Sequence, residues 1–137
     1  IAESKLKAIE EQKELKEEEV VVKVIDKSNV PKDTDKWIFS DYVAFEIGIT
    51  NNSDKDIKGI QGEIDIKDMF DVSFLTISCD LTGDTIAAGE TSINNKMSLE
   101  INEFMNPHNK LYVSEYDDLI FEYKISKILF TDGTIKE

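Results

Sequence analysis

Apolar and polar residues alternate along most of the chain from residue 20 onward, which is the spacing of half-buried β-strands. The clearest case is the segment 42–50, where the odd positions from Val43 to Ile49 are apolar. A β-branched run predicts a strand at 20–25. The same period of two predicts strands at 42–50, 57–66, 72–81, 93–101 and 119–125, continuing at 128–130 and returning at 134–136. Short strands about ten residues apart, with no helix between them, predict an all-β antiparallel β-sandwich of about seven strands.

The phase of the alternation predicts which side chains face the core. These are Val43, Phe45, Ile47 and Ile49; Ile60, Ile64 and Ile66; Leu75, Ile77, Cys79 and Leu81; Met97, Leu99 and Ile101; and Leu119, Phe121, Tyr123 and Ile125. The phase shifts at Ser126–Lys127, which predicts a bulge. Polar segments at 28–37, 83–91 and 106–109 predict loops, and Asp132-Gly133 predicts a hairpin turn.

Residues 1–19 have a different pattern from the rest of the chain. They contain no Gly or Pro, and almost all of them are good helix formers with few apolar positions. We therefore expect a polar helical spacer over 1–19, followed by one β-sandwich domain over 20–137. A coiled-coil or partner-docking helix is the alternative, but it requires a sustained heptad that this segment lacks.

The segment Asn51-Asn52-Ser53-Asp54-Lys55-Asp56 has two interpretations. Asn52, Asp54, Asp56 and Glu63 occupy positions 1, 3, 5 and 12 of a calcium-loop spacing. However, the position that normally holds Gly is Ile57, and the flanking segments are predicted strands. Asn, Asp and Ser also reverse the chain through bonds to the backbone. We predict a turn here, and weaker calcium sites at Asp33 and Asp35 or at Asp117 and Asp118 stay open.

Composition narrows the function classes. The net charge is −13, and all 16 basic residues are lysine. An acidic chain without arginine forks is a poor candidate for nucleic-acid binding, and an anionic membrane surface would also repel it. The length of 137 residues suits one domain. No segment reaches the roughly 18 apolar residues of a membrane span.

The sequence offers little for catalysis. His108 is the only histidine and Cys79 the only cysteine, so no His–Cys metal cluster and no internal disulfide are expected. Cys79 is in phase with apolar neighbours, which predicts a buried and unreactive thiol. There is no nucleophile motif and no phosphate-binding glycine loop. We predict a protein that is not an enzyme, with no catalytic, cofactor or metal residues.

Aromatic residues in or beside the predicted loops are the candidate ligand-binding residues. They are Trp37, Tyr42, Tyr112 and Tyr116. Exposed aromatic rings at the rim of a sandwich would suit carbohydrate binding. The alternative, which we favour, is that Trp37 plugs one end of the sandwich. The loops 28–41 and 102–117 are the segments that a binding protein or a secreted inhibitor of an enzyme would present.

Three short segments resemble the FxLYD type of immunoglobulin-like domain found in small extracytoplasmic bacterial lipoproteins. Ile49-Thr50-Asn51 is similar to the Val-Thr-Asn step of that family. Ile64-Asp65-Ile66-Lys67-Asp68 stands where the Phe-x-Leu-Tyr-Asp motif lies and keeps its apolar spacing and its Asp. Ala88-Gly89-Glu90 resembles the Pro-Gly-Glu turn. Each residue also has a physical role: Asp68 can bond the backbone of the turn that follows it, and Gly89 permits a positive φ in the turn before the strand at 93–101.

The resemblance implies an immunoglobulin-like sandwich at the cell surface. A lipid-anchored cysteine upstream of Ile1 would attach the chain to the membrane, and residues 1–19 would be the spacer. The expected function is a non-catalytic binding or interaction module, whose partner is an envelope protein or a cell-wall component. The alternatives are a carbohydrate-binding module and a secreted enzyme inhibitor.

Overall fold

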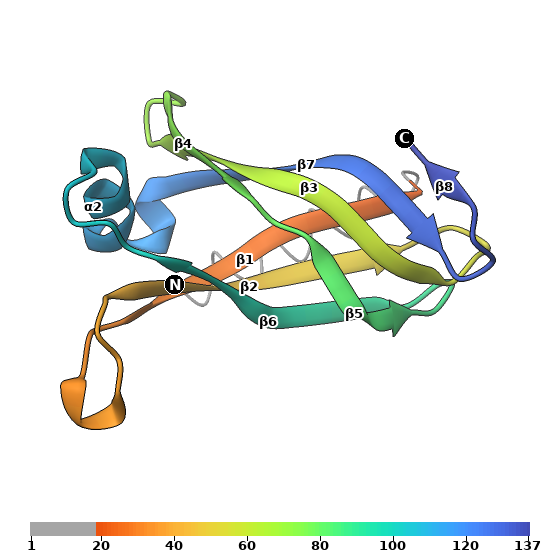
Figure 1. The fold of residues 1–137 in the computed structure, drawn as a ribbon. Coiled ribbons are helices and arrows are strands. Elements are labelled where there is room, and N and C mark those ends of the chain that lie inside the picture. The colour runs from red at the N-terminus through yellow and green to blue at the C-terminus, as the bar shows by residue number, and fades with distance from the viewer. Residues whose placement is uncertain (1–18) are drawn as a thin grey trace.

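The computed structural model describes residues 19–137, so nearly all of the predicted spacer over 1–19 lies outside the described residues. The described residues form two antiparallel β-sheets that pack face to face (Figure 1). The first sheet has the order β1-β2-β6, with bounds Val20–Val30, Tyr42–Asn51 and Thr91–Glu100. The predicted antiparallel sandwich is confirmed.

The second sheet is organised around its long central strand, β3 (Ile57–Asp68). On one side β3 pairs with β7 (Leu119–Phe130), whose far end pairs with the short β8 (Ile135–Lys136). On the other side two short strands share the edge of β3. They are β4 (Ser73–Ser78), which pairs with residues 63–67, and β5 (Leu81–Ile86), which pairs with residues 57–60.

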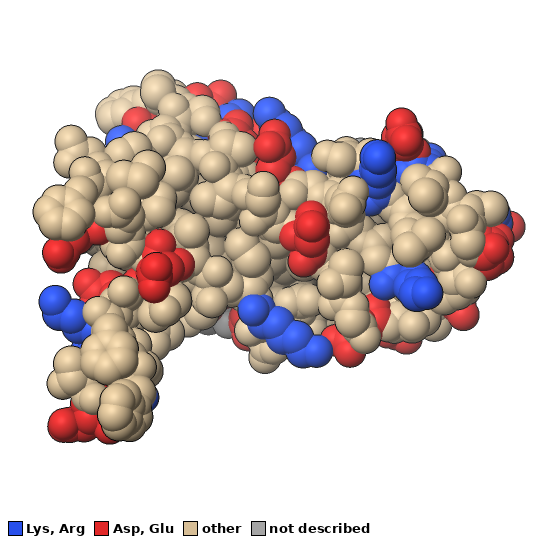
Figure 2. All heavy atoms as spheres, in the orientation of Figure 1, with Lys and Arg blue, Asp and Glu red and all other residues tan. Residues whose placement is uncertain are grey.

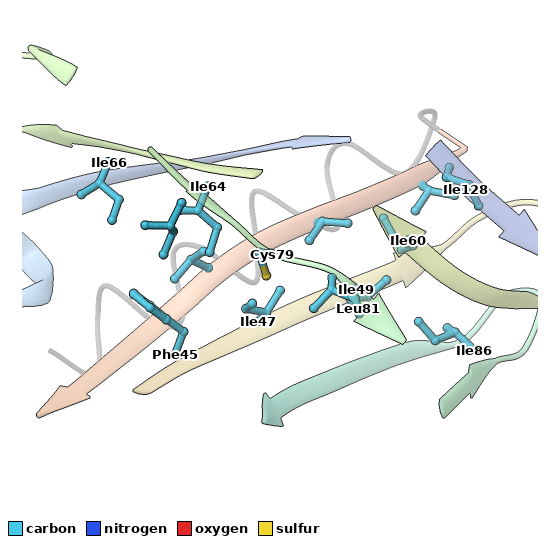
Figure 3. Packing of buried hydrophobic residues seen from close by; sticks show 14 of the residues in the cluster. Phe45, Ile47, Ile49, Ile60, Ile64, Ile66, Cys79, Leu81, Ile86 and Ile128 are labelled. Atoms are coloured by element: carbon cyan, nitrogen blue, oxygen red, sulfur yellow. The ribbon is translucent and has the colours of Figure 1, made fainter. Parts of the chain in front are cut away.

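The core lies between the two sheets, and the predicted alternation places most of its side chains (Figure 3). The four inward residues of β2 are at most 2% exposed, and Ile60, Ile64 and Ile66 of β3 are fully buried. Phe45 of β2 meets Phe121 of β7 edge to face, with 6.1 Å between ring centroids, so the two sheets are joined by an aromatic contact. Burial of this apolar surface is the main favourable term in folding.

The bulge predicted at Ser126–Lys127 is confirmed. The register between β3 and β7 shifts where Gln61 pairs with Lys127 and Gly62 pairs with Ile125. The same shift corrects one predicted core residue, because Ile125 is 37% exposed. A second shift lies in β1 at Ile25. There the predicted strand ends, whereas the real strand continues to Val30 with a polar face that breaks the alternation.

The predicted strand over 72–81 is two strands, and this prediction is corrected. The chain breaks at Cys79, whose backbone N donates to the carbonyl of Gly62 at 2.9 Å, and resumes in β5. Much of the predicted connection over 83–91 is therefore strand. Only the first and last residues of β5 are buried, so β5 shows no alternation. The prediction that Cys79 is buried is confirmed, since it is 1% exposed.

A short helix, α2 (Asn106–Val113), replaces the loop predicted at 106–109. It joins β6 to β7 at one end of the sandwich and inserts Leu111 fully into the core. Pro107 lies in its first turn, where the missing backbone N–H removes no helical hydrogen bond. Two single turns of 3-10 helix, η1 (Thr34–Lys36) and η2 (Tyr116–Asp118), lie at the same end.

Candidate functional site: the aromatic end of the sandwich

The strands run between two ends that differ in chemistry. We call one the aromatic end; it holds the connections 31–41, 69–72 and 101–118 (Figure 1). The other is the polar end, with the connections 52–56, 87–90 and 131–134. Each connection of the aromatic end carries at least one exposed aromatic side chain: Trp37 at 82% and Phe39 at 64%, Phe70 at 81%, and Phe104 at 89% exposed.

The β1–β2 connection projects from the body of the molecule, and its surface is mostly uncharged with acidic residues at the tip (Figure 2). Its shape is fixed by hydrogen bonds between Asp33 and Ile38, at 2.8 and 2.9 Å. Trp37 has a φ of 61°, a left-handed conformation that is unfavourable for a bulky residue. Its ring meets that of Phe39 edge to face at 6.1 Å. The backbone is thus held in a strained conformation that leaves both rings in solvent.

The β3–β4 turn is held by Asp68. One carboxylate oxygen accepts hydrogen bonds from the backbone N–H of Phe70 and of Val72, at 2.9 and 3.1 Å. These bonds hold the pKa of Asp68 below its ordinary value. The other oxygen pairs with Lys110 of α2 at 3.3 Å. The turn role expected for Asp68 is therefore confirmed, and it fixes the backbone that carries Phe70.

The β6–α2 connection is held by the first residues of the helix. The backbone N–H of Asn102 donates to Nδ1 of His108 at 3.0 Å, and the amide of Asn109 donates to the carbonyl of Glu103 at 2.8 Å. The side chain of Asn102 accepts from the backbone N–H of Phe104 at 3.0 Å. The most exposed aromatic ring of the molecule thus stands on a loop with a defined conformation.

Helix α2 is anchored to β1 by Lys27. Its ammonium group donates to the carbonyls of Leu111, Tyr112 and Ser114 at 2.8, 3.2 and 2.6 Å. A cation is favourable at the C-terminal end of a helix, where carbonyl groups lack helical partners. Burial lowers the pKa of Lys27, while the charge of Glu115 opposes that shift. The position of the helix, and of the loop before it, therefore depends on a residue of the first sheet.

A hollow of about 320 Å³ lies between the β1–β2 connection and the β6–α2 connection. Its lining combines aromatic, acidic and neutral polar groups with one lysine. It is lined by Lys32, Phe39, Ser40, Asp41, Glu100, Ile101, Asn102, Glu103 and Phe104. The backbone N–H of Lys32 donates to the carboxylate of Asp41 at 2.9 Å, and that of Ile101 donates to the carbonyl of Asp41 at 2.9 Å. The first bond lies within the β1–β2 connection, and the second joins that connection to the β6–α2 connection.

The four predicted ligand-binding residues do not form one surface. Trp37 is exposed, so the favoured prediction that it plugs the end of the sandwich is wrong. Tyr42 donates its hydroxyl to Glu100 at 3.1 Å, which raises the pKa of the tyrosine. Tyr112 and Tyr116 pack against the core, and they line a second hollow of about 250 Å³. Tyr116 also donates to the carbonyl of Val24 at 2.9 Å.

Sequence reasoning missed Phe39, Phe70 and Phe104 as exposed residues. All three lie outside the predicted strands and directly beside a second apolar residue (Ile38, Met69 and Met105), so apolar and polar residues do not alternate there. That is the signal that would have separated them from core aromatics.

The polar end is organised by Asn51, which is fully buried. Its side-chain amide donates to the carbonyls of Lys55 and Ile86 at 2.8 and 3.0 Å. Its side-chain oxygen accepts from the backbone N–H and hydroxyl of Ser53 at 3.0 and 2.6 Å. The predicted turn after β2 is thus confirmed, and Glu63 lies within β3, away from that turn. The positive φ expected at Gly89 is also confirmed, at 81°.

Within residues 19–137, no three His, Cys, Asp or Glu side chains gather into a group suited to a metal ion. In the same range no helix has the length and apolar character needed to cross a membrane. Burial raises the pKa of Cys79 to about 11, so the thiol stays protonated near neutral pH.

Comparisons of the chain with protein-family models, with curated proteins and with solved structures found no match.

Proposed function

We propose that this chain is a non-catalytic, extracytoplasmic interaction module of a bacterial surface lipoprotein, and that its aromatic end binds an envelope protein. The observation that carries the proposal is the exposure of Trp37, Phe70 and Phe104, each above 80%, on three separate connections at one end. Large exposed apolar groups that gather on one surface mark interaction sites, and aromatic residues are enriched in the cores of protein interfaces.

The conformations of these connections support the proposal. The three loops that carry these rings are held by side-chain oxygens of Asp33, Asp68 and Asn102, which accept hydrogen bonds from backbone N–H groups. A surface that is already ordered loses less conformational entropy when it binds. The strained backbone of Trp37 is also typical of a site at which function rather than stability decides the conformation.

The strand order supports an immunoglobulin-like identity for the sandwich. In immunoglobulin constant-type domains, strands A, B, E and D lie in one sheet and C, F and G in the other. Here β1, β2 and β6 take the places of A, B and E, and β3, β7 and β8 take those of C, F and G. No strand takes the place of D beside β6, because β4 and β5 both pair with β3. Together with the resemblance of residues 49–91 to FxLYD-type domains, this supports the lipoprotein address. Mass spectrometry of the native N-terminus tests that address, and an unmodified chain in the cytosol would overturn it.

Site-specific photo-crosslinking in intact cells tests the binding end. Benzoylphenylalanine replaces Phe39 or Phe104 at the aromatic end, and Asp54 at the polar end as the matched control. We expect the two aromatic positions to capture the same protein and the control position to capture none. Equal capture from both ends would refute a binding end. Products with lipid alone would show that the rings dock on a membrane instead.

Carbohydrate binding is the second candidate, because Trp37 is 82% exposed and free to stack on a sugar ring. It has less support than protein binding, since Tyr112 and Tyr116 pack against the core and do not extend the surface of Trp37. Specific retention of a glycan on an array, lost in Trp37→Ala, would favour this candidate.

Inhibition of an enzyme is a special case of protein binding, in which the projecting β1–β2 connection would bind the enzyme. Co-purification with a hydrolase would identify it.

A further inference from the structure

Acidic side chains outnumber basic ones in the hollow between the two connections. Asp41, Glu100 and Glu103 line it, and Lys32 is the single basic residue among the lining groups. Within residues 19–137, none of these three carboxylates forms an ion pair. A ligand in this hollow therefore meets a surplus of negative charge, and a positive group on the ligand is favoured.

The form of the hollow selects an organic cation over a metal ion. The described carboxylates are not grouped closely enough to coordinate a metal. They line instead a space of about 320 Å³, and Phe39 and Phe104 are the aromatic residues of the same lining. A lysine or arginine side chain has an apolar stem that packs on such rings and a charged head that pairs with carboxylates. The molecule has a similar pair of its own, because Lys110 lies 4.7 Å over the ring of Phe74 while it contacts Asp68.

The two walls of the hollow are fixed before any ligand arrives. Ile101 is buried and donates to Asp41, so the start of one connection is tied to the end of the other. Glu103 and Phe104 stand on the loop that His108 and Asn109 hold. A preformed site of this kind gains affinity because little has to be ordered on binding.

We propose that this hollow receives a lysine or arginine side chain of the partner protein, which is the basic group that the aromatic end recognises. The proposal rests on the proposed function, since it specifies the chemistry of the partner at the same end. Phe39 and Phe104 contact the stem of the side chain, and Asp41, Glu100 and Glu103 surround its charge. The other exposed rings, Trp37 and Phe70, contact apolar groups around it.

A peptide titration tests the charge requirement directly. The probe is acetyl-Leu-Arg-Leu-amide at millimolar concentration, and its neutral isostere acetyl-Leu-citrulline-Leu-amide is the control ligand. Amide signals of the isotopically labelled protein report the position. We expect the arginine peptide to shift signals of Phe39, Asp41 and residues 101–104, and the citrulline peptide to leave them in place. The double variant Glu100→Gln/Glu103→Gln is expected to weaken binding about threefold to tenfold.

A control variant and the crosslinking experiment distinguish failure of the charge preference from failure of the binding end. Asp54→Asn at the polar end removes a charge of the same kind and is expected to leave binding unchanged. Equal shifts with both peptides, no shifts with either, or an equal loss in Asp54→Asn would each overturn the proposal. If photo-crosslinking from Phe104 still captures one protein in that case, the binding end stands and only its preference for a basic side chain is refuted.

Discussion

At the polar end, polar side chains form hydrogen bonds to backbone groups and to one another. At the centre of these bonds is Asn51, the last residue of β2, which is completely buried. At the aromatic end, similar bonds from Asp33, Asp68 and Asn102 hold the backbone, but the large side chains beside them lie in solvent. Burying one such ring would stabilise the folded state by about 1.5–3 kcal/mol. The exposed rings of the aromatic end do not contribute this free energy. The difference separates an end whose hydrogen bonds close the fold from an end whose hydrogen bonds present a surface.

The largest effect is expected from Asn51→Ala. It removes four hydrogen bonds and leaves the buried carbonyl of Ile86 without its donor. We expect the free energy of unfolding to fall by about 2–4 kcal/mol. Urea denaturation followed by circular dichroism measures it. Asn95→Ala, at an exposed position of β6, is the control, and an equal loss there would show that Asn51 does not organise the polar end.

Lys27→Met tests how the aromatic end is attached. The change keeps the apolar stem but removes the three bonds to the carbonyls at the end of α2. We expect a loss of about 1–2 kcal/mol, with faster amide exchange in α2 than in the sheets. Hydrogen exchange measures both. Lys58→Met, at an exposed position of β3, provides the baseline, and unchanged exchange in α2 would contradict the anchoring role.

Comparing Trp37→Gly with Trp37→Ala separates the effect of losing the ring from the effect of the strained backbone. Both remove a ring that is 82% exposed, so little burial is lost in either variant. They differ because glycine adopts a φ of 61° without steric cost, whereas alanine does not. We expect the glycine variant to be more stable than the alanine variant by about 1 kcal/mol, while both lose crosslinking to the partner. Thermal denaturation measures the difference, and equal stabilities would show that no strain is stored there.

The smallest effect concerns pH at the polar end. Asp132 accepts bonds from Thr134 and pairs with Lys55, and these lower its pKa from 3.8 to about 2. A carboxyl group whose pKa is depressed in the folded state stabilises that state above pH 3.8, and the contribution is lost as pH falls toward 2. Asp132→Asn should therefore be less stable than wild type at pH 6 and approach it at pH 2. A constant difference between the two proteins across that range would contradict this mechanism.

Strands in which apolar and polar residues alternate, such as β2, were predictable from the sequence. The short elements without that alternation, β5 and α2, were not. β2 and the middle of β3 have one apolar face each, so their pattern gave both the strand and its buried side. β5 buries only its two terminal residues, and α2 buries only Leu111. Neither element contains a full period of apolar positions, so the first was predicted as a connection and the second as a loop.

The site was less predictable than the fold for a related reason. The direction of a loop side chain depends on the backbone conformation around it, and the spacing of apolar and polar residues does not report that conformation. Phe104 is exposed because helix residues His108 and Asn109 hold its loop. The hollow exists because residues near 40 and near 102 meet. The turn residues Asp68 and Gly89 were predictable because each acts on its own local backbone.

Trp37 is the only tryptophan of the chain, and it stands outside the core that folding creates. Indole emission should therefore change little when the sandwich unfolds, whereas the signals of the backbone and of the partly buried tyrosines follow the whole transition. The same emission should shift toward shorter wavelength when a partner covers the tip of the β1–β2 connection. On these expectations, the proposed docking and the unfolding of the sandwich can be followed separately in one unlabelled sample through this one intrinsic fluorophore.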